Sequence, residues 1–191
     1  MMRLKMSRIG FLGLMGLMIL AMGLLVLVIC RQRHEAAWIK APCGEVRWEA
    51  ARFPIPIYYD SVLPLDWIKP LEDGGALIDP KDVLFSWKGT LPLGTEQPLY
   101  SIVLEQWNDD GHGRTHWEVD KACHVTKMFV SLPVLMLPGK GRVRAAAHEL
   151  GHGLGLGHSD WENDIMYPKA STWFPFRLSP MEQSLLNSYV H

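Results

Sequence analysis

Apolar residues are distributed unevenly along the chain and separate a long uncharged segment near the N-terminus from a region of shorter runs. Residues 9–30 carry no charge and are rich in Leu, Met, Ile and Gly. Their length is that of a bilayer-spanning helix, which needs roughly 20 apolar residues. Basic residues precede this segment, and no small-residue cleavage site follows it. We therefore predict a membrane anchor within residues 1–31, with a cleaved signal segment as the alternative.

Downstream, shorter runs predict a mixture of strands and helices. Residues 141–154 hold mostly strong helix formers and are followed by Gly155, which predicts a helix that ends there. Residues 32–51 are expected to form a linker before a domain over residues 52–191. Strands are predicted where apolar and β-branched residues lie between turn-forming residues. These runs are residues 55–59, 100–106, 117–119 and 124–132.

Residues 63–93 contain several helix breakers within one stretch. Pro removes a helix hydrogen bond and Gly lowers helix propensity. The breakers are Pro64, Pro70, Gly74, Gly75 and Pro80. The sequence therefore predicts no long helix in this region, and at most a short helical piece near residues 80–87.

The composition is that of one folded domain with an N-terminal appendage. The chain has 191 residues, of which 48% are hydrophobic and eight are tryptophan. Its net charge is −1 and no basic stripe is present, which argues against a nucleic-acid-binding surface.

One short segment contains the residues for metal chemistry. His148 and His152 are four residues apart, so a helix places both imidazoles on one face, within reach of one zinc ion. Glu149 follows the first histidine and faces the remaining coordination position, where it can accept a proton from a zinc-bound water. Gly155 lets the chain turn back, so that His158 becomes the third ligand. Three histidines leave one position open, which is typical of catalytic and not of structural zinc.

The whole pattern, His-Glu-Leu-Gly-His followed by a third histidine and Met166, matches the metzincin signature with its Met-turn. Ser159 after the third histidine, Tyr167 and Pro168 after the methionine, and residues 177–189 resemble the matrixins, the matrix metalloproteinase branch of the metzincins. This resemblance implies an α+β zincin domain with a twisted mixed sheet, an active-site helix and a C-terminal helix, preceded here by the apolar N-terminal helix.

The resemblance also implies a zinc-dependent endopeptidase. A metal-activated water would hydrolyse the peptide bond, with Glu149 as the general base that then delivers the proton to the leaving amine. Met166 would pack beneath the metal without binding it.

By the same resemblance, the segment after the Met-turn lines a pocket beside the metal. The candidate lining residues are Tyr167, Pro168, Trp173, Phe174 and Phe176. Packing of the three aromatic residues against the C-terminal helix is the alternative interpretation. The strand at residues 124–132 is expected to be the sheet edge that holds an extended peptide substrate.

Three cysteines form an odd set, and one of them, Cys30, lies in the apolar segment. A disulfide between Cys43 and Cys123 suits an oxidising compartment. Cys43 followed by Gly44 also resembles the latency cysteine of matrixins, although the flanking residues of that motif are missing. Free thiols are the third alternative.

A second metal site is weakly indicated. The candidate ligands are His112, His116, Asp109 and Asp110, which lack the spacing of the structural sites in matrixins. A solvated turn is the favoured interpretation. We expect one catalytic zinc, and the sequence does not support structural calcium or a second zinc.

Two other functions stay open. The first is a non-catalytic, zinc-stabilised binding or structural protein, which would need the histidines but not Glu149. The second is a cell-wall peptide hydrolase, for which a separate wall-binding module is expected, and the sequence shows none. The favoured interpretation is an extracytoplasmic peptidase that acts on polypeptides. It would be anchored in the membrane by its N-terminal segment, or secreted if that segment is cleaved. The sequence predicts no particular oligomeric state.

Overall fold

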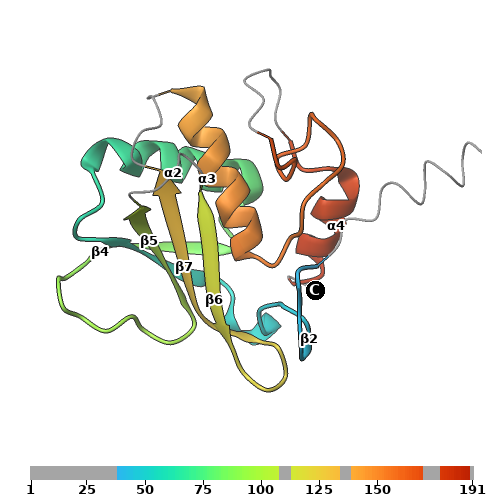
Figure 1. The fold of residues 1–191 in the computed structure, drawn as a ribbon, viewed down its shortest axis with the longest axis horizontal. Coiled ribbons are helices and arrows are strands. Elements are labelled where there is room, and N and C mark those ends of the chain that lie inside the picture. Colours follow the sequence, from blue (N-terminus) through green and yellow to red (C-terminus); the bar gives the residue numbers. More distant parts are fainter. Residues whose placement is uncertain (1–37, 108–112, 134–138, 170–176, 190–191) are drawn as a thin grey trace, which may run out of the picture. The chain divides into compact units, whose positions relative to one another are not determined.

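The computed structural model describes residues 38–107, 113–133, 139–169 and 177–189 (Figure 1). All of them fall within the unit that spans Ala36–His191. The apolar helix predicted over residues 9–30 lies outside the described residues. Among the residues that are described, no helix has the length and apolar character needed to cross a membrane.

A five-stranded mixed sheet lies at the centre of this unit, in the order β4-β3-β5-β7-β6 (Figure 1). Strands β4, β3, β5 and β7 are parallel to one another, and β6 is antiparallel to β7. Parallel strands are covered on both faces and are therefore apolar along their whole length. Ile102, Val103 and Leu104 of β5 are accordingly all buried. The strands are β3 (Ile55–Asp60), β4 (Phe85–Leu91), β5 (Ser101–Trp107), β6 (Arg114–Val119) and β7 (Val125–Pro133).

The strand order corrects the expected substrate edge. Strand β7, predicted as the edge, has β5 on one side and β6 on the other, so that prediction was wrong. The edge on this side of the sheet is β6. Strands β6 and β7 form a hairpin, and the local apolar pattern cannot show which of its two strands lies further in.

Helix α2 (Leu65–Ile78) occupies the region in which the sequence predicted no long helix, so that prediction was also wrong. Pro70 lies inside the helix and removes the N–H that would bond the Asp66 carbonyl. The Arg142 guanidinium lies 3.4 Å from that carbonyl oxygen and 2.7 Å from the Asp66 carboxylate. A donor from a distant residue therefore compensates for the proline.

Two glycines allow α2 to pack closely against its neighbours. A Cβ at Gly74 would lie 2.8 Å from the Cβ of Ala146 in α3 (Lys140–Gly153), and one at Gly75 would lie 2.7 Å from the Trp87 ring of β4. Tertiary packing of this kind outweighs the low helix propensity of glycine.

The helical piece expected near residues 80–87 is absent, and the chain forms a turn that leads into β4. The buried Asp79 carboxylate stabilises this turn by accepting three backbone N–H groups. These belong to Val83 (3.0 Å), Leu84 (2.6 Å) and Phe85 (3.0 Å).

Residues 38–48, which we call the N-terminal strap, pack on the domain although all of them fall within the linker that the sequence predicts. The strap contains the antiparallel pair β1 (Lys40–Ala41) and β2 (Gly44–Glu45) and precedes the 3-10 helix η1 (Ala50–Arg52). Val46 and Trp48 belong to the buried core. A disulfide joins Cys43 of the strap to Cys123 in the β6–β7 turn, with a Cα–Cα distance of 5.6 Å.

The C-terminal helix α4 (Pro180–Asn187) confirms the expected element. The Glu182 backbone N–H donates to Ser179 Oγ (3.2 Å), and the Ser179 N–H donates to Glu182 Oε2 (2.6 Å). This reciprocal capping box satisfies donors that a helix start leaves unpaired.

A matched pair of glycine substitutions tests the close approach of α2 and α3. Gly74→Ala places a methyl group 2.8 Å from α3 atoms, so the free energy of unfolding should fall by about 1–3 kcal/mol. Gly141→Ala, in α3 with nothing within 4 Å of the added Cβ, should raise it by about 0.5–1 kcal/mol. Urea unfolding measures both changes. A more stable Gly74→Ala variant would contradict the close contact.

Candidate active site

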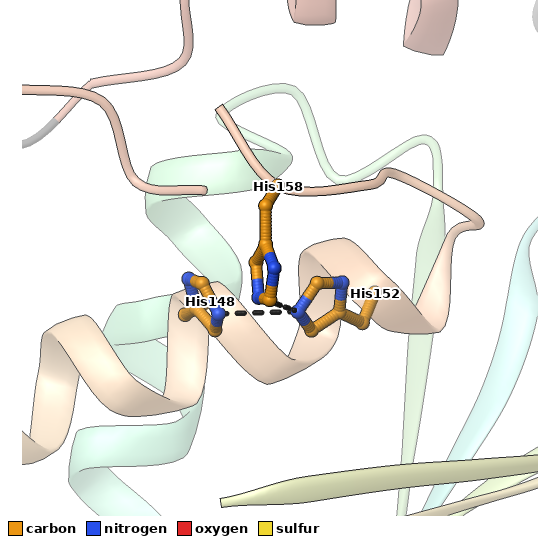
Figure 2. A group of neighbouring side chains, drawn as sticks. All are labelled: His148, His152 and His158. Carbon is orange, nitrogen blue, oxygen red and sulfur yellow. Dashed lines mark hydrogen bonds between the residues drawn. The ribbon is translucent and has the colours of Figure 1, made fainter. Parts of the chain in front are cut away.

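Three histidine side chains converge on one point from two adjoining segments (Figure 2). His148 and His152 project from α3, and His158 reaches the same point from the loop that follows. The His152 Nε2 atom lies 3.1 Å from Nε2 of His148 and 3.2 Å from Nε2 of His158. Tetrahedral ligands at about 2.0–2.1 Å from a metal lie about 3.3–3.4 Å apart. The triad therefore has the spacing to hold one metal ion.

The turn after α3 returns His158 to the other two histidines. Gly155 has a φ of +91°, a conformation that favours glycine. Its N–H donates to the His152 carbonyl (2.8 Å), and the Leu156 N–H donates to the Gly151 carbonyl (3.0 Å). These two bonds form a Schellman motif, which ends the helix and reverses the chain as the sequence predicted.

Hydrogen bonds from distant segments satisfy the next three carbonyls, which have no partner within the helix. Two donors come from the start of the described chain and one from its end. The bonds run from Trp48 Nε1 to the Gly153 oxygen (2.7 Å), from Tyr189 Oη to the Leu154 oxygen (2.8 Å), and from Ile39 N to the Gly155 oxygen (2.9 Å). No local pattern in the sequence predicts these contacts, which hold the turn from two sides.

Backbone carbonyls orient two of the imidazole rings. His148 Nδ1 lies 2.8 Å from the Ile165 oxygen, and His152 Nδ1 lies 2.7 Å from the Leu156 oxygen. A carbonyl can only accept, so each Nδ1 carries the proton and each Nε2 presents a lone pair to the shared point. Burial lowers the pKa of His148 to about 4 and that of His152 to about 3. Both rings are therefore neutral at pH 7, the form that binds metals.

Glu149 is 6% exposed and lines the same cavity as the histidines. Burial raises the pKa of its carboxyl to about 7, and a hydrogen bond from Thr115 Oγ1 to Oε2 (2.9 Å) opposes this rise. A Cβ at Gly113 would lie 2.7 Å from the Glu149 Cδ, so glycine leaves the room that the carboxylate occupies. Gly113 and Thr115 could not be predicted from the sequence, because their role depends on β6 lying beside α3.

The Met-turn lies directly below the active-site helix. Met166 is fully buried, and a Cβ at Gly151 would lie 3.2 Å from its Cε atom. The following segment is held by Arg144, whose guanidinium donates to the carbonyls of Lys169 (2.8 Å) and Tyr167 (3.3 Å). The Met-turn and this segment therefore form one wall of the site.

A cavity of about 910 Å³ surrounds the triad and Glu149. Of the predicted pocket residues, Tyr167 and Pro168 line it, whereas Trp173, Phe174 and Phe176 lie outside the described residues. Ile39, Thr115 and Trp117 also line it, from the strap and from β6.

The second metal site is not formed within the part of the chain that the structure describes, where the triad is the one cluster able to hold an ion. His116 lies exposed on β6, and the other three candidates, Asp109, Asp110 and His112, fall outside that part.

Comparison with known families agrees with this geometry. The family model of the matrixins matches residues 107–180, a range that includes the three histidines, Glu149 and Met166. No curated protein matches the chain. The match confirms the resemblance to matrixins and supports a metallopeptidase in general.

The lowered pKa values of His148 and His152 predict how the metal-free protein responds to acid. Both imidazoles have an ordinary pKa of 6.5, so in the unfolded chain they bind protons below that pH. In the folded chain His148 binds a proton only below about pH 4, and His152 only below about pH 3. The free energy of unfolding should therefore fall as the pH drops from 6.5 toward 4, and these rings should contribute no pH dependence above that window.

Urea unfolding of chelator-treated protein at pH 7 and pH 5 measures this effect. The double variant His148→Gln/His152→Gln should lose less stability between the two pH values than the wild type, and His116→Gln serves as an exposed control. An unchanged loss in the double variant would contradict the burial of neutral rings.

Proposed function

We propose that this protein is a zinc-dependent endopeptidase. The observation that carries the proposal is the buried Glu149 carboxylate, which lies in an open cavity beside three convergent histidines and is not needed to bind a metal. A structural site would need the histidines alone. The all-imidazole donor set and its 3.1–3.2 Å spacing suit zinc, which binds histidine nitrogen and keeps an open position in catalytic sites.

Bound zinc would lower the pKa of a water molecule and polarise the substrate carbonyl. The protein supplies the rest. Glu149 would accept a proton from the attacking water and then return it to the leaving amine. Thr115 donates a hydrogen bond to the carboxylate, and Gly113 leaves room for it.

The edge strand β6 is the proposed binding site for the substrate backbone. It pairs only with β7 in the sheet, and its residues Thr115 and Trp117 line the cavity. An extended peptide can add to such an edge through backbone hydrogen bonds, which leaves sequence preference to side-chain pockets. This arrangement favours an endopeptidase that acts on polypeptides.

An extracytoplasmic location, by a membrane anchor or by secretion, remains part of the proposal. The Cys43–Cys123 disulfide supports it, because such bonds persist in oxidising compartments and are rare in the cytosol. The same bond argues against Cys43 as a latency switch, since a disulfide-bonded sulfur is not a free thiolate ligand.

Glu149→Gln tests the proposed general base. The substitution keeps the shape of the side chain but removes its basicity, so peptide cleavage should fall by about 10²–10⁴-fold while one zinc per chain is retained. Metal analysis and the cleavage rate of a peptide substrate give the two readouts. The matched control is Glu45→Gln, an exposed glutamate of the strap, which should cleave at the wild-type rate. Full activity in Glu149→Gln would refute the mechanism, and zinc binding by an inactive wild type would favour a structural protein.

Thr115→Val tests the positioning of that carboxylate. A hydrogen bond to a charged group contributes about 1.5–3 kcal/mol, so kcat should fall by about 10–100-fold, with KM little changed. Thr115→Ser keeps the hydroxyl group and should restore most of kcat. Equal loss in both variants would show that the hydroxyl group alone does not account for the effect, and full activity in Thr115→Val would contradict the positioning role.

A further inference from the structure

The residues that line the cavity extend along α3, from Arg144 to His152 and on to the turn that follows the helix. Arg144 lies one turn before His148 and holds the segment after the Met-turn, whereas Ile39 is bonded to Gly155 beyond the other end of the helix. At 1.5 Å per residue, the helix from Arg144 to Gly153 spans about 14 Å, and the turn that bears Gly155 follows its end. The metal-binding point lies between Arg144 and this turn, so a bound peptide would reach the Ile39 end on one side of its scissile bond only.

Ile39 is held rigidly at its end of the cavity. Its N–H donates to the Gly155 carbonyl (2.9 Å) and its carbonyl accepts from Val46 N (2.7 Å), while the preceding Trp38 forms a β-bridge with Leu156. The Cys43–Cys123 disulfide fixes the strap a few residues further on. The Ile39 side chain is half-buried and lines the cavity. Its backbone is held by hydrogen bonds on both sides.

The two lining residues that the chain path places nearest Ile39, Trp117 and Gly157, carry no charge. Strand β6 contacts Glu149 through Thr115 and then runs toward the turn that bears Cys123. Trp117 follows Thr115 on this strand and therefore lies between Glu149 and that turn. Trp117 and Gly157 line the cavity together with Ile39. This end of the cavity therefore suits an apolar substrate side chain.

We propose that Ile39 is a specificity-determining residue, which contacts the substrate side chain on the side of the scissile bond away from Arg144 and selects apolar groups by size. This inference rests on the proposed peptidase function. A single methylene in an apolar pocket changes discrimination by about 10–200-fold, and the half-exposed position of Ile39 places the expected effect near tenfold.

Two substitutions at Ile39 with opposite effects on volume test the assignment. Wild type, Ile39→Ala and Ile39→Phe are incubated with a peptide library, and kcat/KM is compared for peptides that differ only in the size of one apolar residue. Ile39→Ala should shift the preference about tenfold toward larger side chains at one substrate position, and Ile39→Phe should shift it toward smaller ones at the same position. Leu93→Ala, a loop residue that is 84% exposed, is the control and should keep the wild-type profile.

The outcomes separate this inference from the function on which it rests. If the wild type cleaves peptides and both Ile39 variants keep its profile, the specificity assignment is overturned and the peptidase proposal stands. If the zinc-loaded wild type cleaves no peptide in the library, both are overturned. Thermal unfolding is recorded for every variant. The shift toward smaller residues in Ile39→Phe decides the matter if Ile39→Ala does not fold, since loss of stability alone cannot reverse a size preference.

Discussion

Every carbonyl group at the C-terminal end of α3 requires a hydrogen-bond donor, because a helix supplies none and this end is buried. Gly155 and Leu156 satisfy two of these carbonyls through the Schellman turn, and Leu154 N satisfies the Leu150 oxygen. Trp48, Tyr189 and Ile39 supply donors to the three that follow. The turn that brings His158 back to the metal point is therefore bonded to segments near both ends of the described chain. Preorganisation of the ligands follows from the requirement to pair buried backbone groups.

Burial acts in opposite directions on the two kinds of titratable group in the site. It lowers the pKa of His148 and His152 to about 4 and 3, and raises that of Glu149 to about 7, because in each case the charged form loses hydration. The result is a set of neutral nitrogen donors beside a carboxyl that can exchange a proton near neutral pH. A bound cation would favour the carboxylate form of Glu149 and so lower its pKa from this starting point. The same low-dielectric environment thus prepares both the ligands and the base.

Local sequence pattern predicted the elements whose causes are local. Helix α3 follows from its helix formers and Gly155, and α4 begins with a capping box visible as Ser179 and Glu182. Helix α2 was missed because its compensations are distant. Arg142, 76 residues along the chain from Asp66, donates to the carbonyl that Pro70 leaves without its helical partner. The glycines of α2 are explained only by the α3 and β4 atoms beside them.

The same distinction between local and distant causes separates the site residues that the sequence predicts from those that it does not. The histidines and Glu149 occupy fixed spacings on one helix and turn, so the sequence alone brings them together. Thr115 contacts Glu149 across 34 residues, and its role depends on β6 being the edge strand, which only the sheet order reveals. The whole strap was predicted to be linker for the same reason. The buried Trp48 of the strap donates from its indole Nε1 to the Gly153 carbonyl, which is 105 residues away in the sequence.

The two ends of the cavity are fixed by different kinds of bond. At the Arg144 end, hydrogen bonds from one guanidinium to the carbonyls of Tyr167 and Lys169 hold the wall. At the Ile39 end, the strap and the β6–β7 hairpin are joined covalently through Cys43 and Cys123, which are 80 residues apart in sequence. A crosslink over a loop of this length restricts the unfolded chain strongly, typically by about 2–4 kcal/mol. Because it also joins the strap to the edge strand proposed to bind substrate, the two sides of the cavity at this end cannot separate without breaking a covalent bond. The opposite end can widen by exchanging hydrogen bonds with water, so adjustment to different substrates is expected there and strict selection at Ile39.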